Sequence, residues 1–194
     1  MIERATTEKD LNSRFYQHNE GLAKRWENFV NEHNGNIDGI VNGFILEVNA
    51  SINNKEKKIR INLLRQLSNK TASHSAGLLM TKNTIIEIDS IKPDEKNWSL
   101  ISQNKILKLI YSLTKNCGTF SVDNRYMIVS NDKINEPRIF DLKYWKNLSN
   151  IAEIRRMSFS DGKIKIEYSN FLGPESAESV INSILNKYEA NQTQ

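Results

Sequence analysis

The sequence has very little cysteine and no long apolar run. Cys117 is the only cysteine among 194 residues, so an intrachain disulfide is impossible and a zinc site built from several cysteines is excluded. No window approaches the roughly 18 uncharged apolar residues of a membrane span, and the first 15 residues contain no apolar stretch of the kind found in a signal peptide. These absences predict a cytoplasmic protein that makes no contact with a membrane.

The fingerprints of common enzyme sites are also missing. Lys70-Thr71 lacks the preceding glycines of a phosphate-binding P-loop, and the chain has no GxSxG nucleophile elbow. His18 and His33 lie on one predicted helix at a separation of roughly 22 Å, which is too far for both to bind one metal ion. His74, within SNKTASHSAGLL, is predicted to lie in a surface connection. We therefore expect no metal site and no cofactor, and the lack of a convergent acid–base pair argues against an enzyme.

The composition is that of a folded and mildly basic protein. Hydrophobic residues make up 38% of the chain and charged residues 26%, which differs from the composition of disordered chains. The length predicts a single domain over 1–194, with two possible subregions at 1–97 and 98–190. The formal charge of +4 is small, so nucleic-acid binding depends on whether the basic residues gather on one face.

Helical spacing of apolar residues appears in four segments. Thr7 and Asp10 resemble a variant capping box, and the helix that they begin is expected to end near Asn34-Gly35, with glycine in the left-handed cap. A middle helix is predicted over 101–118, and a short helix capped by Asp141 is predicted in DLKYWKNL. A C-terminal helix begins at Gly173-Pro174-Glu175. Its predicted buried stripe is Ala177, Val180, Ile181, Ile184, Leu185 and Tyr188.

Alternating apolar and polar residues predict strands between these helices. The segments 39–52 and 57–64 are expected to form a hairpin with one wet face, followed by two short strands around Lys82-Asn83 and one strand over 119–130. The order of elements predicts an α+β fold. In it, a mainly antiparallel sheet built from hairpins is packed against an N-terminal helix, a middle helix and a C-terminal helix.

The clearest turn signal is Asp161-Gly162, a pair that favours a two-residue type I′ turn. This turn sets Phe159 against Ile164 and Met157 against Ile166 on one face of a hairpin. Apolar residues then meet apolar residues, which supports the predicted register.

The densest basic cluster is KEKKIRINLLRQLSNK, residues 55–70, with six basic residues against one glutamate. Its cations are candidate phosphate contacts for a nucleic acid. The candidate residues are Lys57, Lys58, Arg60, Arg65 and Lys70. The segment contains no aromatic residue for base stacking, so a solvated strand face is the alternative interpretation.

One pattern partly resembles a metal-dependent nuclease. Asp38, Glu47 and Asn49 follow a D-x8-E-x-N spacing, but nucleases of the PD-(D/E)xK type have lysine where Asn49 stands. By elimination, the sequence predicts a non-catalytic binding or protein-interaction module with an unknown protein partner. Nucleic-acid binding through the basic strand is the first alternative, and nuclease activity is the less favoured one.

Overall fold

The computed structural model describes residues 1–4, 7–54, 57–70, 77–89, 97–102, 118–122, 125–130 and 142–192. The helices of this part are α1 (Glu8–Leu11), α2 (Arg14–Glu32), α4 (Leu142–Ile151) and α5 (Pro174–Gln192). The first strands are β1 (Ile2–Arg4), β2 (Asn36–Val41), β3 (Ile45–Asn54), β4 (Lys57–Lys70) and β5 (Gly77–Ile88). The later strands are β6 (Trp98–Ser102), β7 (Gly118–Ser121), β8 (Tyr126–Ser130), β9 (Ile154–Ser160) and β10 (Lys163–Tyr168).

The ten described strands form one sheet in the order β1-β2-β3-β4-β5-β10-β9-β6-β8-β7. The pairing of β1 with β2 is parallel, and the other described pairs are antiparallel. The predicted α+β class with a mainly antiparallel sheet is therefore confirmed. Pairing of β10 with β5 brings the last hairpin of the chain to the middle of the sheet.

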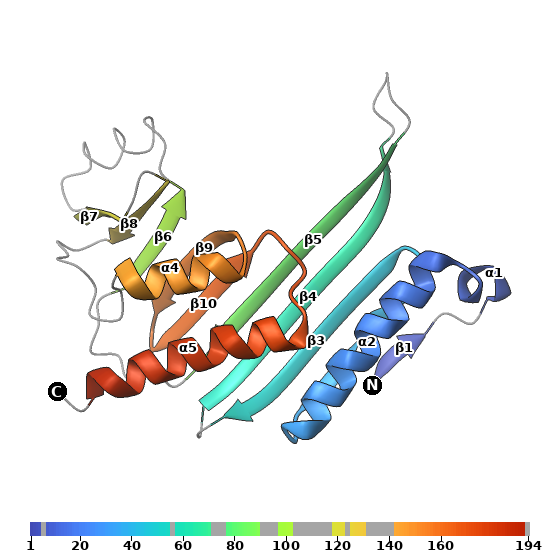
Figure 1. Ribbon diagram of the computed structural model, residues 1–194, viewed down its shortest axis with the longest axis horizontal. Helices are drawn as coiled ribbons and strands as arrows, with labels where there is room; N and C mark the ends of the chain where they lie inside the picture. Colours follow the sequence, from blue (N-terminus) through green and yellow to red (C-terminus); the bar gives the residue numbers. More distant parts are fainter. Residues whose placement is uncertain are drawn as a thin grey trace.

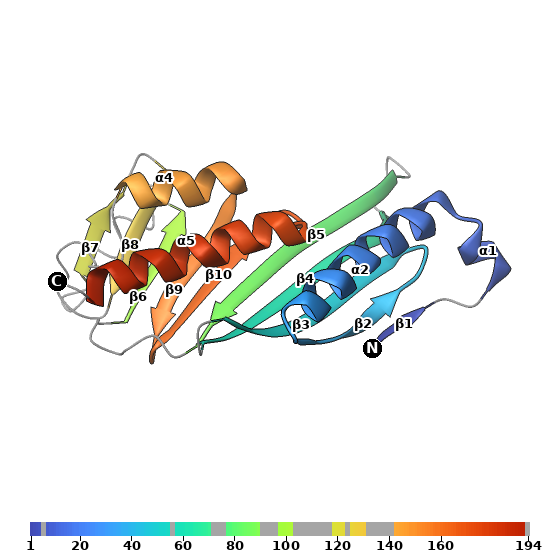
Figure 2. The ribbon, with the colours of Figure 1, turned by 60° about the horizontal axis from the view of Figure 1, so that its bottom comes forward.

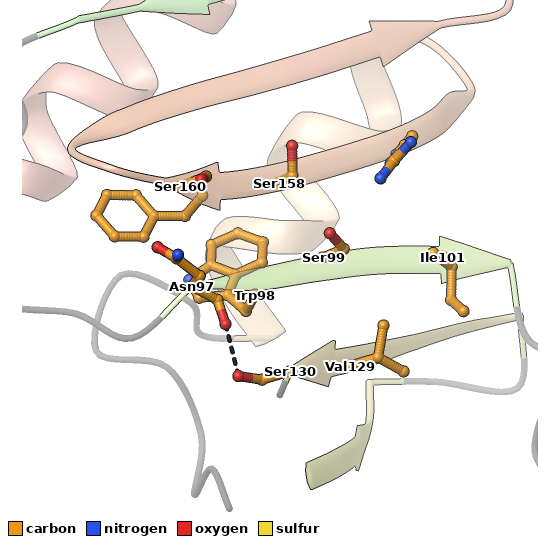
Figure 3. Close-up of a pocket in the computed structure, with 10 residues that line it drawn as sticks. Asn97, Trp98, Ser99, Ile101, Val129, Ser130, Ser158 and Ser160 are labelled. Atoms are coloured by element: carbon orange, nitrogen blue, oxygen red, sulfur yellow. Dashed lines mark hydrogen bonds between the residues drawn. The ribbon is translucent and has the colours of Figure 1, made fainter. Parts of the chain in front are cut away.

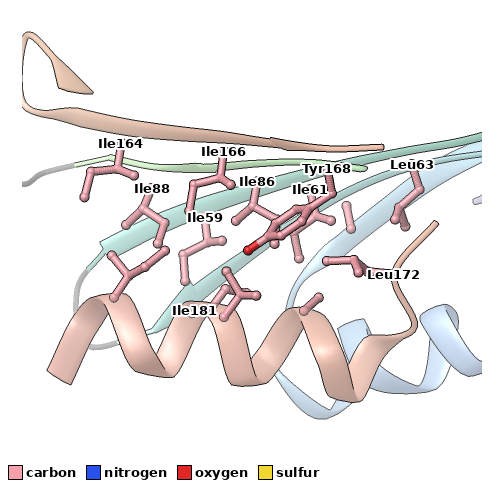
Figure 4. Packing of buried hydrophobic residues seen from close by; sticks show 14 of the residues in the cluster. Ile59, Ile61, Leu63, Ile86, Ile88, Ile164, Ile166, Tyr168, Leu172 and Ile181 are labelled. Carbon is pink, nitrogen blue, oxygen red and sulfur yellow. The ribbon is translucent and has the colours of Figure 1, made fainter. Parts of the chain in front are cut away.

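The helices α2, α4 and α5 lie on the same side of the sheet (Figures 1 and 2). Alternate residues of the central strands are buried beneath them, which is why Ile59, Ile61 and Leu63 of β4 are less than 2% exposed. Figure 4 shows these side chains packed with residues of β5, β10 and α5. The predicted stripe of α5 is confirmed at Ala177, Val180, Ile181, Ile184 and Leu185. The Tyr188 side chain lies outside the described residues.

The opposite face of the sheet carries polar and charged side chains. Arg60 of β4 is paired with Glu87 of β5 at 3.3 Å and with Asp89 at 2.9 Å, and Lys165 of β10 lies 3.4 Å from Glu87. Cations and carboxylates therefore alternate across neighbouring strands of this open face. None of the helices in the described segments has the length and apolarity needed to cross a membrane.

The predicted hairpin at Asp161-Gly162 is confirmed. Both residues have positive φ, 50° and 73°, as a type I′ turn requires. Phe159 pairs with Ile164 and Met157 with Ile166, as the sequence predicts. The predicted capping contact of Thr7 is also present, because its side chain accepts a hydrogen bond from the Asp10 N–H.

The N-terminal helix differs from the prediction in two ways. It is interrupted after α1, and α2 starts anew with Ser13 as its N-cap, because the Ser13 Oγ accepts from the Tyr16 N–H. At its other end, Asn34 has the left-handed φ of 49° that was expected of Gly35. Gly35 instead permits close packing, since a Cβ there would lie 2.5 Å from the Ser51 carbonyl oxygen.

Three strand predictions were wrong in their boundaries. The two short strands expected around Lys82-Asn83 are one continuous strand, β5, because β4 pairs with it along its whole length. The single strand expected over 119–130 is two strands, β7 and β8, which pair with each other. Ile101 and Ser102, which were expected to begin the middle helix, instead belong to β6, which lies between β8 and β9. The rest of that predicted helix, with Cys117, lies outside the described residues, as does Asp141, the expected cap of α4.

Tyr168 offers a stability prediction. Its side chain is fully buried, and its hydroxyl has no hydrogen-bond partner in the described part of the chain. We expect Tyr168→Phe to stabilise the protein by about 1 kcal/mol, because the variant removes an unsatisfied buried group. Burial raises the pKa of Tyr168, so the unfolded chain loses this proton at a lower pH than the folded protein does. The free energy of unfolding is therefore unaffected by Tyr168 below the ordinary pKa near 10 and falls as the pH rises above it. The Tyr168→Phe variant lacks that decline.

The matched control for this change is Tyr126→Phe. The Tyr126 hydroxyl is also buried, but it donates to the Ile154 carbonyl oxygen at 2.9 Å. This substitution is expected to destabilise the protein by about 1 kcal/mol, as measured by urea unfolding. Equal effects of the two substitutions would contradict the assignment of an unpaired hydroxyl to Tyr168.

Candidate anion-binding site

A hollow of about 450 Å³ lies on the open face where β6, β8 and β9 meet. Figure 3 shows Ser99 and Ser158 on neighbouring strands of it, with Ser130 beside Asn97. The Ser130 hydroxyl donates to the Asn97 carbonyl oxygen at 2.5 Å, and Ser160 donates to Asp161. Arg156 is the one ionisable residue in its described lining, so that lining has no acid–base pair.

A second hollow on the open face, of about 320 Å³, is lined by both cations and carboxylates. Arg60, Glu87 and Lys165 line it, and these are the residues of the ion pairs described above. Partly exposed pairs of this kind contribute little free energy and leave no strong field for a ligand.

The third hollow, of about 350 Å³, lies on the helix side of the sheet between α2 and the start of α5. We call it the α2–α5 pocket. Helix α2 contributes His18, Leu22 and Arg25, β4 contributes Arg65, and β5 contributes Lys82. Phe171, Gly173, Glu175 and Ser176 complete the described lining from the segment before α5 and its first turn. Basic side chains thus predominate in this pocket.

Local structure explains how these cations come together. His18, Leu22 and Arg25 are spaced by four and three residues, so they lie on one side of α2. Arg65 continues the alternation of β4 that places Ile61 and Leu63 beneath the helices, and it pairs directly with Lys82 of β5. The strand register therefore places two cations opposite each other at the edge of the core.

Arg65 is held in position by Asn19. The Arg65 Nη1 donates to the Asn19 Oδ1, and the Asn19 Nδ2 donates to the Asn42 carbonyl oxygen at 2.9 Å. Asn19 is only 2% exposed, so its orientation is set by its surroundings. Burial lowers the pKa of Arg65, but a guanidinium remains charged at neutral pH. The pocket thus contains a fixed, half-buried cation with a neutral hydrogen-bond partner.

The positive charge of the pocket is incompletely balanced. The Arg25 Nη2 lies 2.6 Å from the Glu175 Oε2, and this pair accounts for the one carboxylate in the described lining. Among the described residues, neither Arg65 nor Lys82 has a carboxylate partner within salt-bridge distance. Like charges directly opposite each other in a sheet are destabilising, so an anion between them would relieve their repulsion.

The pKa of His18 reflects burial and the positive field of the pocket, and the first turn of α5 lies beside it. The pKa of His18 is lowered, first by burial and then by the charges of Arg65 and Lys82. A helix N-terminus favours negative charge, and the Glu175 carboxylate already occupies that position in the first turn of the 19-residue helix α5. The effect of Arg65 and Lys82 on His18 shows that their charges act inside the pocket, where an anion would be favoured.

In comparisons with known proteins, no family model, curated protein or solved structure matches the chain. The interpretation of the pocket therefore depends on its own geometry.

The structure separates the residues predicted for the basic strand. Arg65 alone lines the α2–α5 pocket, whereas Arg60 lies on the open face with its carboxylate partners. Lys58 is exposed near the start of β4 and pairs with Asn53, and Lys57 pairs with Asn54. Lys70 ends β4, and its side chain lies outside the described residues, as do all atoms of His74. The predicted contacts therefore do not form one basic face.

The nuclease pattern shows no metal-binding arrangement in the described segments. Asp38 accepts a hydrogen bond from the Asn49 Nδ2 at 3.0 Å, so an amide occupies the place next to this carboxylate. Among the described residues, no group of three or more His, Cys, Asp or Glu side chains is placed to hold a metal ion.

Sequence reasoning missed most of the pocket. His18 and Arg25 are seven residues apart in the sequence, a spacing that places two residues on the same face of a helix. Their meeting with Lys82 and with the start of α5 depends on strand register and on helix packing. No local pattern in the sequence contains that information.

Proposed function

We propose that this chain is a non-catalytic binding module that holds an anionic group in the α2–α5 pocket. The observation that supports the proposal most strongly is the cross-strand pair of Arg65 and Lys82, which has no carboxylate partner among the described residues. A volume of about 350 Å³ is enough for a carboxylate, sulfate or phosphate group with part of its carrier.

A binding role is favoured over a catalytic one by the chemistry of the lining. Glu175 is occupied by Arg25, and His18 has no carboxylate to orient it in the described part of the chain. General acid–base catalysis needs a positioned donor and acceptor pair, whereas electrostatic binding needs fixed cations. The described lining contains cations and no such donor and acceptor pair.

Titration with sulfate tests this proposal, because sulfate keeps its double charge across the working pH range. We expect sulfate to bind the wild-type protein and to shift the NMR signals of α2, β4, β5 and the start of α5. Arg65→Gln should weaken binding about tenfold or more, since it removes a charge-assisted hydrogen bond. Calorimetry or chemical-shift titration measures the change.

Arg60→Gln is the matched control, because Arg60 lies on the same strand but faces the open side of the sheet. It should leave sulfate affinity unchanged. Wild-type protein that binds no sulfate, or a loss of affinity that is equal in both variants, would contradict the proposal. A single-stranded oligonucleotide tested beside sulfate examines nucleic-acid binding to the open face, where Arg60 lies. Binding there predicts a larger effect of Arg60→Gln than of Arg65→Gln.

The pH dependence of sulfate binding gives a further prediction. Because the pKa of His18 is lowered, the ring is neutral at neutral pH and gains a proton as the pH falls. Arg65 and Lys82 act on His18 through their charges, and Arg25 and Glu175 also line the pocket. A bound anion offsets the repulsion, raises the pKa of His18 and couples binding to proton uptake.

Sulfate affinity should therefore rise as the pH falls from about 8 to about 5. His18→Gln should remove most of that rise while leaving the affinity at high pH nearly unchanged. An identical pH profile in this variant would show that another group is responsible.

A further inference from the structure

Partly exposed apolar side chains adjoin the α2–α5 pocket. Leu67 follows Arg65 by two residues on β4, Met80 precedes Lys82 by two residues on β5, and Leu67 and Met80 are direct cross-strand partners. Because side chains two residues apart in a strand point to the same face, the apolar pair continues the row of the basic pair. Met80 is 36% exposed although it lies on the helix side of the sheet.

Two phenylalanines lie at the same end of the molecule. Phe15 precedes Asn19 by one turn of α2, and Asn19 is the residue that holds Arg65. The Phe44 carbonyl oxygen accepts a hydrogen bond from the Leu67 N–H at 2.7 Å, which places Phe44 beside β4. Phe15 is 41% exposed and Phe44 58% exposed. We call Phe15, Phe44, Leu67 and Met80 the apolar shelf.

The shelf occurs where the sheet extends beyond its helices. Figure 1 shows β4 and β5 continuing past the N-terminal end of α2, while α5 crosses the sheet near its middle. The helix face of these strands is therefore covered by α5 near the core and loses that cover towards the ends of the strands. The basic pocket lies at the transition between the two regions.

We propose that the occupant of this surface is a segment of a partner protein that carries carboxylates beside apolar side chains. The inference rests on the proposed function, since the carboxylates of the partner segment would occupy the anion site in the α2–α5 pocket. Charge complementarity predicts the carboxylates of the segment, because Arg65 and Lys82 line the pocket and have no carboxylate partner among the described residues. The adjacent Leu67 and Met80 identify the apolar part.

A free inorganic anion would leave the apolar shelf in water. A nucleic acid would stack bases on Phe15 and Phe44, but it would leave Leu67 and Met80, the residues next to the basic pair, without a matching group. An acidic peptide with apolar side chains satisfies both regions at once, because peptide grooves commonly combine charged and apolar anchors. The surface thus fits one peptide with two kinds of anchor.

The test is selection of a random dodecapeptide library on immobilised full-length protein. The peptides enriched by the wild type should combine aspartate or glutamate with leucine, isoleucine or phenylalanine. The double variant Arg65→Gln/Lys82→Gln should not enrich them, and synthetic copies should bind it at least tenfold more weakly. Met80→Ser should weaken the same peptides about tenfold but leave sulfate affinity unchanged.

Several results would overturn the inference. These are enrichment of peptides without acidic residues, equal enrichment by the double variant, or no enrichment at all. Stronger binding of a single-stranded oligonucleotide or of anionic lipid vesicles than of any selected peptide would assign the surface to a different partner. Melting curves confirm that each variant is folded.

Sulfate binding separates this inference from the proposed function. If sulfate binds in an Arg65-dependent manner but no acidic peptide does, the anion site stands and the peptide inference fails. If sulfate does not bind and acidic peptides do not either, both fail.

Discussion

Gly39→Ala is expected to destabilise the protein by about 3 kcal/mol or more. Gly39 lies in β2 between β1 and β3, with a φ of 147° that side chains rarely permit. A Cβ at this position would lie 2.0 Å from the Glu47 carbonyl oxygen and 2.9 Å from the Glu47 carbonyl carbon. These are backbone atoms, which cannot change rotamer to relieve the clash as a flexible side chain does. Strands β2 and β3 must therefore separate locally.

Urea unfolding measures this loss, and Gly21→Ala is the control. Gly21 lies within α2, and nothing would lie within 4 Å of an added Cβ. Alanine there should stabilise the protein by about 0.5–1 kcal/mol through its higher helix propensity. A Gly39→Ala variant with wild-type stability would contradict the close approach of β2 and β3.

Thr84→Val is expected to destabilise the protein by about 2–4 kcal/mol and to weaken sulfate binding in the α2–α5 pocket. Thr84 is fully buried on β5, and its hydroxyl donates to the Asn170 carbonyl oxygen at 2.8 Å. The same hydroxyl oxygen accepts the Leu172 N–H at 2.9 Å. Valine has nearly the same shape but leaves both backbone groups without their partner.

The effect on binding follows from the location of that contact. Thr84 anchors the segment between β10 and α5, in which Phe171 and Gly173 form one wall of the pocket. Thr84→Ser keeps the hydroxyl and should keep most of the stability and the sulfate affinity. If valine and serine had equal effects, the loss would come from packing and not from the hydrogen bonds.

Local signals were sufficient for several elements of the fold. Asp161-Gly162 supplies residues that tolerate positive φ, so a two-residue turn and the register of Phe159 against Ile164 follow from the sequence alone. The apolar spacing of α5 likewise predicts its buried stripe, because helix geometry converts spacing into a face. Such features depend on interactions between residues that are close in the chain.

Long-range pairing changed other predictions. Lys82-Asn83 reads as a break in the sequence, but β4 supplies a partner for every residue from Gly77 to Ile88, and β5 is continuous. Trp98–Ser102 has no strong strand signal, and its assignment depends on β8 and β9, whose residues are distant in the chain. In both cases hydrogen bonding to a partner strand outweighs local preference.

The sequence by itself determined the α+β class, the hairpin at Asp161-Gly162, the buried face of α5 and the basic character of residues 55–70. Only the tertiary structure decided what those basic residues face. Alternation along β4 sends Arg60 to carboxylates on the open face and Arg65 to the helix side, where the register of β5 brings Lys82 and the packing of α2 brings His18. The sequence gives the sign of each charge but not the distances between charges. The electrostatic energy of a site depends on those distances, which are set only when the chain folds.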